Sequence, residues 1–99
     1  MRYYWQVAIQ SFICQDTEQL FKRHRVRRFI NIESVARRKL EQLEWAGELQ
    51  DLRVPPGNHL EALLHDRHGQ HSIRINSQFR LCFVWTGQGP AQVEIVDYH

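Results

Sequence analysis

The strongest constraint on the fold is the alternation of polar and apolar residues over positions 72–85. A period of two is typical of a β-strand with one buried face. Residues 76–78 interrupt the alternation and predict a three-residue hairpin loop, which places Arg74 opposite Arg80. Both arginines then lie on one face of the sheet. The other face is expected to bury Ile73, Ile75, Phe79, Leu81 and Phe83.

Two helices are expected before this hairpin. The first runs from Thr17 to about Arg23, and the Asp16 carboxylate is expected to cap its N-terminus. The second runs from Ile32 to Ala46 and follows Asn31, another residue type that caps helices. In the second helix, apolar residues recur at steps of three and four, which predicts one buried stripe.

Three further segments complete the expected order of elements. Strands are expected at residues 6–12 and 92–98, and the Pro-containing run at 54–58 is expected to be a loop. The order is therefore one strand, two helices, and three or four antiparallel strands. This order predicts an α+β fold, a small antiparallel sheet with two N-terminal helices packed on one face.

Length and composition limit the class of protein. Ninety-nine residues suit one domain, residues 1–99, and a hydrophobic share of 42% excludes a disordered tail. No apolar run reaches the roughly 18 residues of a membrane-spanning helix, and the first ten residues lack the features of a secretion signal. Two cysteines are too few for a disulfide framework and suit a reducing compartment. We therefore expect a cytoplasmic protein that does not contact a membrane.

Positive charge is concentrated in the N-terminal part of the chain. The first 40 residues contain nine basic and three acidic side chains, and 11 of all 13 cations are arginine. Arginine binds phosphate through two parallel hydrogen bonds and stacks on bases, so this usage favours a polyanionic partner. Adaptation to high temperature or biased codon usage would also produce this high number of arginines. Four arginines form either a solvated helix end or an RNA-binding surface: Arg23, Arg25, Arg27 and Arg28.

The pair Arg74 and Arg80 allows two interpretations. Two cations that face each other on an exposed sheet surface repel unless an anion lies between them. Either each arginine pairs with a nearby acid such as Asp66 or Asp97, or the two clamp a phosphate group. A clamp of this kind would stabilise the extra negative charge of a phosphorane. The residue pattern leaves both interpretations open.

Histidines and the chain end supply further candidate residues. His65, His68 and His71 follow one another at steps of three, with His59 nearby, so a metal site has to be considered. The segment between them is expected to be a turn, which would not align ligands as a helix does, and we expect no metal. Residues 97–99 (Asp-Tyr-His) follow an apolar strand, and the pattern alone predicts a solvated tail.

Several segments together carry the motifs of one protein family. They are Ser11-Phe12, residues 54–58, residues 60–63, Asp66-Arg67, residues 69–76, residues 78–85 and residues 93–99. In this order the chain resembles the HigB group of the RelE/ParE toxin superfamily, the toxins of bacterial type II toxin–antitoxin systems. The resemblance spans about residues 9–99, so residues 1–8 are expected to be an N-terminal extension.

The resemblance implies a function and partners. Members of this group are ribosome-dependent mRNA endonucleases that use no metal or cofactor and are neutralised by a HigA-type antitoxin. It implies that the chain is a monomer alone, binds the ribosome with its RNA and mRNA, and forms a heteromeric complex with the antitoxin. The cationic N-terminal part would then contact ribosomal RNA or the acidic antitoxin.

The catalytic positions of the family map onto six residues of this sequence: Glu61, Arg67, Arg80, Asp97, Tyr98 and His99. The resemblance implies that His99 or Glu61 takes the 2′-hydroxyl proton and that Asp97 orients His99. Arg67 and Arg80 would hold the phosphate. Tyr98 would stack on a base or donate a hydrogen bond. Which group is the acid and which is the base stays open.

The sequence departs from the family in one motif. The family reads Leu-Lys-Gly-Asp-Arg where residues 63–67 read Leu-Leu-His-Asp-Arg. Leu64 therefore replaces a cation near the expected phosphate, and His65 replaces a turn glycine but would restore a proton donor. Two alternative functions stay open. One is a weakened or inactive module that binds RNA or antitoxin, and the other is a ParE-like gyrase inhibitor, which would not need the Asp-Tyr-His end.

Overall fold

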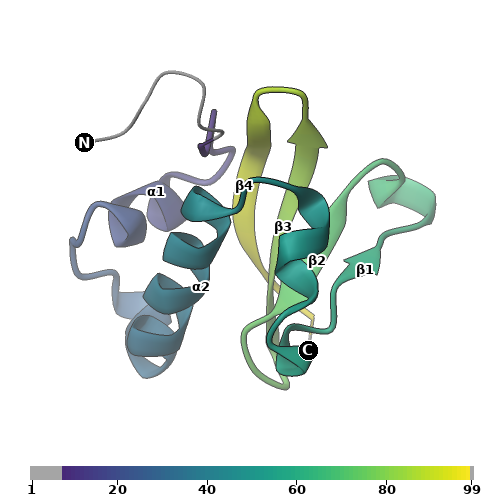
Figure 1. The fold of residues 1–99 in the computed structure, drawn as a ribbon. Coiled ribbons are helices and arrows are strands. Elements are labelled where there is room, and N and C mark those ends of the chain that lie inside the picture. Colours follow the sequence, from purple (N-terminus) through teal and green to yellow (C-terminus); the bar gives the residue numbers. More distant parts are fainter. Residues whose placement is uncertain (1–7, 99) are drawn as a thin grey trace.

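A helical layer packs on one face of a four-stranded sheet in the computed structural model, which describes residues 8–98 (Figure 1). The helices and strands are α1 Gln15–Phe21, α2 Glu33–Trp45, β1 Glu61–Ala62, β2 His71–Arg74, β3 Phe79–Thr86 and β4 Gly89–Asp97. Short 3-10 turns are η1 Arg27–Ile32, η2 Leu49–Arg53, η3 Pro56–Asn58 and η4 His65–Arg67. The predicted α+β class with two N-terminal helices is confirmed. No helix within residues 8–98 is long and apolar enough to cross a membrane.

The hairpin of β2 and β3 has the predicted register. All four strands are antiparallel in the order β1-β2-β3-β4, and Arg74 lies opposite Arg80. The Asn76 side chain closes the loop, because its carbonyl oxygen accepts the backbone N–H groups of Gln78 and Phe79, both at 2.8 Å. Of the five predicted core residues, Phe79 is partly buried, and the other four are buried: Ile73, Ile75, Leu81 and Phe83.

The helices begin differently from the prediction. Helix α1 follows Cys14, and Asp16 lies in its first turn, where it pairs with Arg28 at 3.0 Å. Helix α2 follows Ile32, and Asn31 lies inside η1. The two predicted caps are wrong, since neither helix has a side-chain cap. The reason is tertiary, because η1 buries Phe29 and Ile32 and thereby sets the path of the chain into α2.

The expected first strand is wrong for residues 8–12, and residues 6 and 7 lie outside the described part. Only one bridge forms there, between Phe12 and Val93 in parallel orientation. A bulge in β4 explains this pairing. Gln92 adopts a positive φ of 54° and shifts the register against β3, and Ser11 then accepts the N–H groups of Gln92 and Val93. The fourth strand of the sheet is β1 and not this N-terminal segment. Residues 8–14 instead run along the outer edge of β4.

The core joins the helices to the inner face of the sheet. Helix α2 buries Ala36, Leu40 and Leu43, which repeat at helical spacing as predicted. Helix α1 is joined to β4 by Thr17, whose hydroxyl oxygen accepts the Ile95 N–H at 3.0 Å in a buried position. Neither α1 nor α2 packs on the other face of the sheet, the outer face, which carries the site described next (Figure 1).

Candidate functional site

The alternation of residues along the strands places several polar side chains on the outer face of the sheet. Ile73, Leu81 and Ile95 are buried in the core beneath the helices. Their neighbours in sequence therefore point to the opposite face. These neighbours include Ser72, Arg74, Arg80, Cys82, Glu94 and Val96.

Arg80 is held rigidly on this face. Its Nε donates to the Ser72 hydroxyl at 2.7 Å, and one terminal nitrogen donates to the His59 carbonyl at 2.6 Å. The same nitrogen lies 3.5 Å from the Glu61 carboxylate, and only 14% of the Arg80 side chain is exposed. Among the described residues, the acid beside Arg80 is thus Glu61 of β1 and not Asp66 or Asp97. A guanidinium fixed in this way needs no reorganisation to meet an anion.

Arg74 lies opposite Arg80 and forms no ion pair within residues 8–98. It lines a cleft of about 460 Å³. The other lining residues are Glu61, Asn76, Ser77, Arg80 and Tyr98. We call this cleft, which contains both arginines, the cationic cleft. Because Arg74 forms no ion pair within residues 8–98, the cleft keeps a positive charge that is available to an anion.

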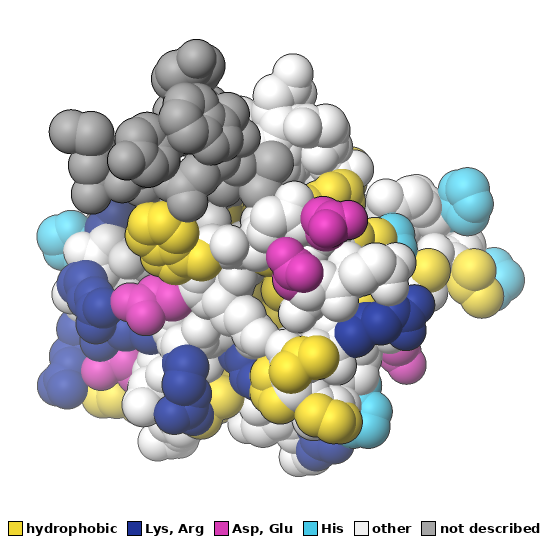
Figure 2. Space-filling view, in the orientation of Figure 1, with side chains coloured by type: hydrophobic (Ala, Val, Ile, Leu, Met, Phe, Trp, Pro, Cys, Tyr) yellow, Lys and Arg dark blue, Asp and Glu magenta, His cyan; other side chains and the backbone are white. Residues whose placement is uncertain are grey.

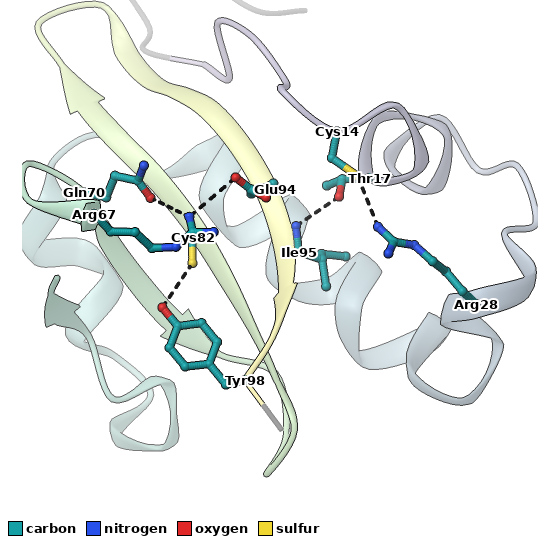
Figure 3. Close-up of polar contacts among 9 residues, drawn as sticks. All are labelled: Cys14, Thr17, Arg28, Arg67, Gln70, Cys82, Glu94, Ile95 and Tyr98. Carbon is teal, nitrogen blue, oxygen red and sulfur yellow. Dashed lines mark hydrogen bonds and ion pairs between the residues drawn. The ribbon is translucent and has the colours of Figure 1, made fainter. Parts of the chain in front are cut away.

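Arg67 lies on the other side of Tyr98. Its guanidinium contacts the Gln70 side-chain oxygen at 3.1 Å and the Glu94 carboxylate at 3.5 Å (Figure 3). It lines a second cleft of about 410 Å³. The other lining residues are Leu64, His65, Asp66, Val96, Asp97 and Tyr98. We call this the Leu64 cleft. Tyr98 is a wall of both clefts, so they are adjacent.

Tyr98 and Cys82 lie between the two arginines. The Tyr98 hydroxyl is 3.8 Å from the Cys82 sulfur, and Figure 3 shows Arg67 beside the same sulfur. Burial and the neighbouring Cys82 raise the pKa of Tyr98, while the charges of Arg67 and Arg80 oppose this rise. Burial likewise raises the pKa of the Cys82 thiol, opposed by its contact with Tyr98 and by both arginines. Both groups therefore keep their protons at neutral pH, and the Tyr98 hydroxyl is able to donate.

The remaining residues of the expected catalytic set are placed as follows. Glu61 is exposed at the rim of the cationic cleft, next to Arg80. Asp97 lines the Leu64 cleft, and its carboxylate accepts a hydrogen bond from the Gln78 amide at 3.0 Å. His99 lies outside the described residues. The structure thus brings Glu61 of β1, Arg67 of η4, Arg80 of β3 and Tyr98, which follows β4, to one region.

The arginines of the N-terminal part lie over the helices and not at this site. Arg23 pairs with Glu41 at 2.6 Å. Arg25 lies 3.8 Å from Glu33, and Arg28 pairs with Asp16. Arg27 is exposed and forms no ion pair within residues 8–98. Over the helices in Figure 2, acidic side chains accordingly lie among the basic ones.

Sequence reasoning missed the residues that hold the arginines. Glu94 and Gln70 position Arg67, and Ser72 and the His59 carbonyl position Arg80. A signal was present for Glu94, since the alternation of β4 places this acid on the outer face. The four histidines considered as metal ligands do not form a site. Within residues 8–98 no three side chains of His, Cys, Asp or Glu gather closely enough to hold a metal ion.

Comparisons with known proteins agree with this architecture. Residues 10–99 match the family model described as RelE-like toxin of type II toxin–antitoxin system HigB. Toxin HigB-1 of Vibrio cholerae is 42% identical over 84 residues, which cover 83% of this chain and 87% of that protein. An uncharacterised protein of Haemophilus influenzae is 42% identical over 53 residues, which cover 54% of this chain and 52% of that protein.

Proposed function

Because the chain belongs to the HigB-like family of RelE-like toxins of type II toxin–antitoxin systems, we propose that it cleaves messenger RNA on the ribosome. The observation that carries this proposal is the approach of Arg67 and Arg80 to Tyr98, with Arg74, which forms no ion pair within residues 8–98, in the same cleft as Arg80. Such a group of guanidiniums, beside a protonated hydroxyl and a carboxylate, suits a phosphodiester whose charge increases during reaction.

The chemistry proposed for this site is an internal transfer of the phosphodiester. The 2′-hydroxyl oxygen attacks phosphorus and the bond to the 5′ oxygen breaks, which leaves a 2′,3′-cyclic phosphate and a 5′-hydroxyl. A base takes the 2′ proton, and an acid returns a proton to the 5′ oxygen. Glu61 and His99 are the two candidates for the base. Tyr98, which keeps its proton at neutral pH, is suited to donate to an oxygen of the phosphate or to stack on a base.

The proposed partners follow from the family and from charge. A HigB-type toxin implies a HigA-type antitoxin as its partner. The ribosome would hold the codon in a reactive conformation, which makes few catalytic groups sufficient. Exposed cations over the helices, among them Arg27, are proposed to contact ribosomal RNA or the antitoxin.

The test is expression without antitoxin, followed by mapping of cuts on a translated message. We expect growth inhibition and cuts within translated codons only. Arg74→Ala should lower the cleavage rate by on the order of 10²-fold or more, because it removes a cation from the cleft. Arg53→Ala is the matched control, since this arginine of η2 is exposed, contacts Gln50 and lies outside both clefts.

Other outcomes distinguish the alternatives. Arrest of replication with intact mRNA would instead favour a gyrase inhibitor. Normal growth with intact mRNA would favour an inactive module, which is the alternative that the exposed Leu64 at the second cleft motivates. Arg80→Ala is less suitable as a first variant, because it also removes hydrogen bonds to Ser72 and His59 that stabilise the sheet. A thermal unfolding curve of each variant separates lost folding from lost chemistry.

A further inference from the structure

The two clefts beside Tyr98 differ in chemistry. The cationic cleft contains Arg74 and Arg80, whereas the Leu64 cleft combines an apolar wall of Leu64, Val96 and Tyr98 with the polar side chains of His65, Asp66, Arg67 and Asp97. Leu64 is 67% exposed and Tyr98 is 47% exposed. Large apolar side chains that gather at a cleft expose surface that a ligand would bury. Figure 2 shows hydrophobic side chains next to histidines at the protruding end between β1 and β2, the segment that contains Leu64, His65 and His68.

The Leu64 wall is held in place by its own segment. The Leu63 N–H donates to the Gln70 carbonyl at 2.8 Å, and the Arg67 N–H donates to the Leu64 carbonyl at 3.2 Å. Arg67 is anchored to Glu94 of β4 through its side chain. His65 adopts a φ of 57°, the left-handed conformation, which turns the chain sharply after Leu64. The exposed Leu64 therefore lies in a tight turn that hydrogen bonds and an ion pair hold in place.

We propose that the apolar wall of the Leu64 cleft binds one nucleobase of the RNA, next to the phosphate that Arg67 and Arg80 would hold beside Tyr98. This proposal rests on the proposed function and adds a specificity site to it. Single-stranded RNA presents phosphate and base alternately, and the two clefts share Tyr98 as a wall. A strand whose phosphate lies beside Tyr98 would therefore bring a base to the apolar wall of the Leu64 cleft. Tyr98 and Leu64 would contact the faces of the base. His65 and Asp66, at the same cleft, offer hydrogen-bonding groups to its edge.

The first experiment compares cut sites. Cleavage positions on translated messages are sequenced for the wild-type protein, Leu64→Ala and Val54→Ala. Val54 is also 67% exposed but lies in neither cleft, which makes it the matched control. We expect Leu64→Ala to change the relative use of bases at one position next to the cut by on the order of tenfold. Val54→Ala should keep the wild-type preference. An unchanged preference in active Leu64→Ala overturns the base site and leaves the nuclease proposal intact.

The second experiment does not depend on cleavage. Methyl signals of Leu64 are followed by NMR while the four nucleoside monophosphates, or ribose 5-phosphate as a probe without a base, are added to the wild-type protein. Shifts with a nucleotide but not with ribose 5-phosphate support the base site, even if no RNA is cut. Equal responses to both probes, or none, overturn it. In this way the failure of the base site and the failure of the proposed function give different results.

Discussion

At the scale of single residues, the two cysteines have opposite surroundings. Cys82 is fully buried, and burial raises the pKa of its thiol. Burial also acts to raise the pKa of the Cys14 thiol, but hydrogen bonds from Thr17 and from the Asp16 backbone, with the charge of Arg28, lower it overall. The Arg28 guanidinium lies 3.3 Å from the Cys14 sulfur (Figure 3).

These surroundings predict different reactivity. We expect iodoacetamide to alkylate Cys14 in the folded protein, with a midpoint of the pH profile below that of an ordinary thiol, because the thiolate is the reacting form. Cys82 should react only on unfolding. The measurement is mass spectrometry of the two peptides after timed alkylation between neutral and alkaline pH. Arg28→Ala should move the Cys14 midpoint upward, and an unchanged midpoint would show that Arg28 does not stabilise the thiolate.

At the scale of elements, a buried polar side chain, Asn58, joins the segment after α2 to the helical layer. Asn58 is fully buried in η3, and its amide nitrogen donates to the carbonyls of Leu52 and Val54 and to the Gln42 side chain. Its oxygen accepts from Lys39 of α2 at 2.5 Å. These hydrogen bonds tie the segment to α2, in addition to the packing of the buried Leu52 of η2.

Asn58→Ala should therefore lower the free energy of unfolding by about 2–3 kcal/mol, because it leaves several partners buried without a hydrogen bond. Asn31→Ala is the control, since Asn31 is exposed in η1 and caps no helix in the structure. Its effect should stay within about 0.5 kcal/mol. Urea unfolding followed by circular dichroism measures both. Equal losses would mean that Asn31 has the capping role that its position in the sequence suggests.

The elements also show which features the sequence could predict. The register of β2 and β3 followed from period-two alternation, because a shift by one residue would expose the core side chains. The helix starts did not follow from local capping residues, since η1 packing decides where α2 begins. The same distinction holds for the candidate site, where the sequence predicts some features and not others. Arg67 and Arg80 could be named from motifs, whereas the contact between Arg67 and Glu94 joins residues 27 positions apart and required the fold.

At the scale of the whole molecule, the arginines that are available to an anionic partner are those that form no ion pair within the protein. The sequence concentrates positive charge in the N-terminal part, but Arg23, Arg25 and Arg28 each lie beside an acid in the structure. Arg27 has no such partner within residues 8–98, and Arg74 has none at the cationic cleft. Within residues 8–98, arginines without an ion pair therefore include Arg27, over the helices, and Arg74, on the outer face of the sheet.

This distribution predicts how the proposed binding to the ribosome depends on salt. A cation that contacts a phosphate releases counterions, so its removal lowers the slope of log affinity against log salt by about 1. We expect this for Arg27→Ala if η1 lies against ribosomal RNA, and a smaller change for Arg23→Ala, because Glu41 already compensates that charge. The measurement is cosedimentation with ribosomes over a series of salt concentrations. Equal slopes for wild type and Arg27→Ala would remove η1 from the ribosome contact, and weaker binding of the same variant to a HigA-type antitoxin would then assign this surface to the antitoxin.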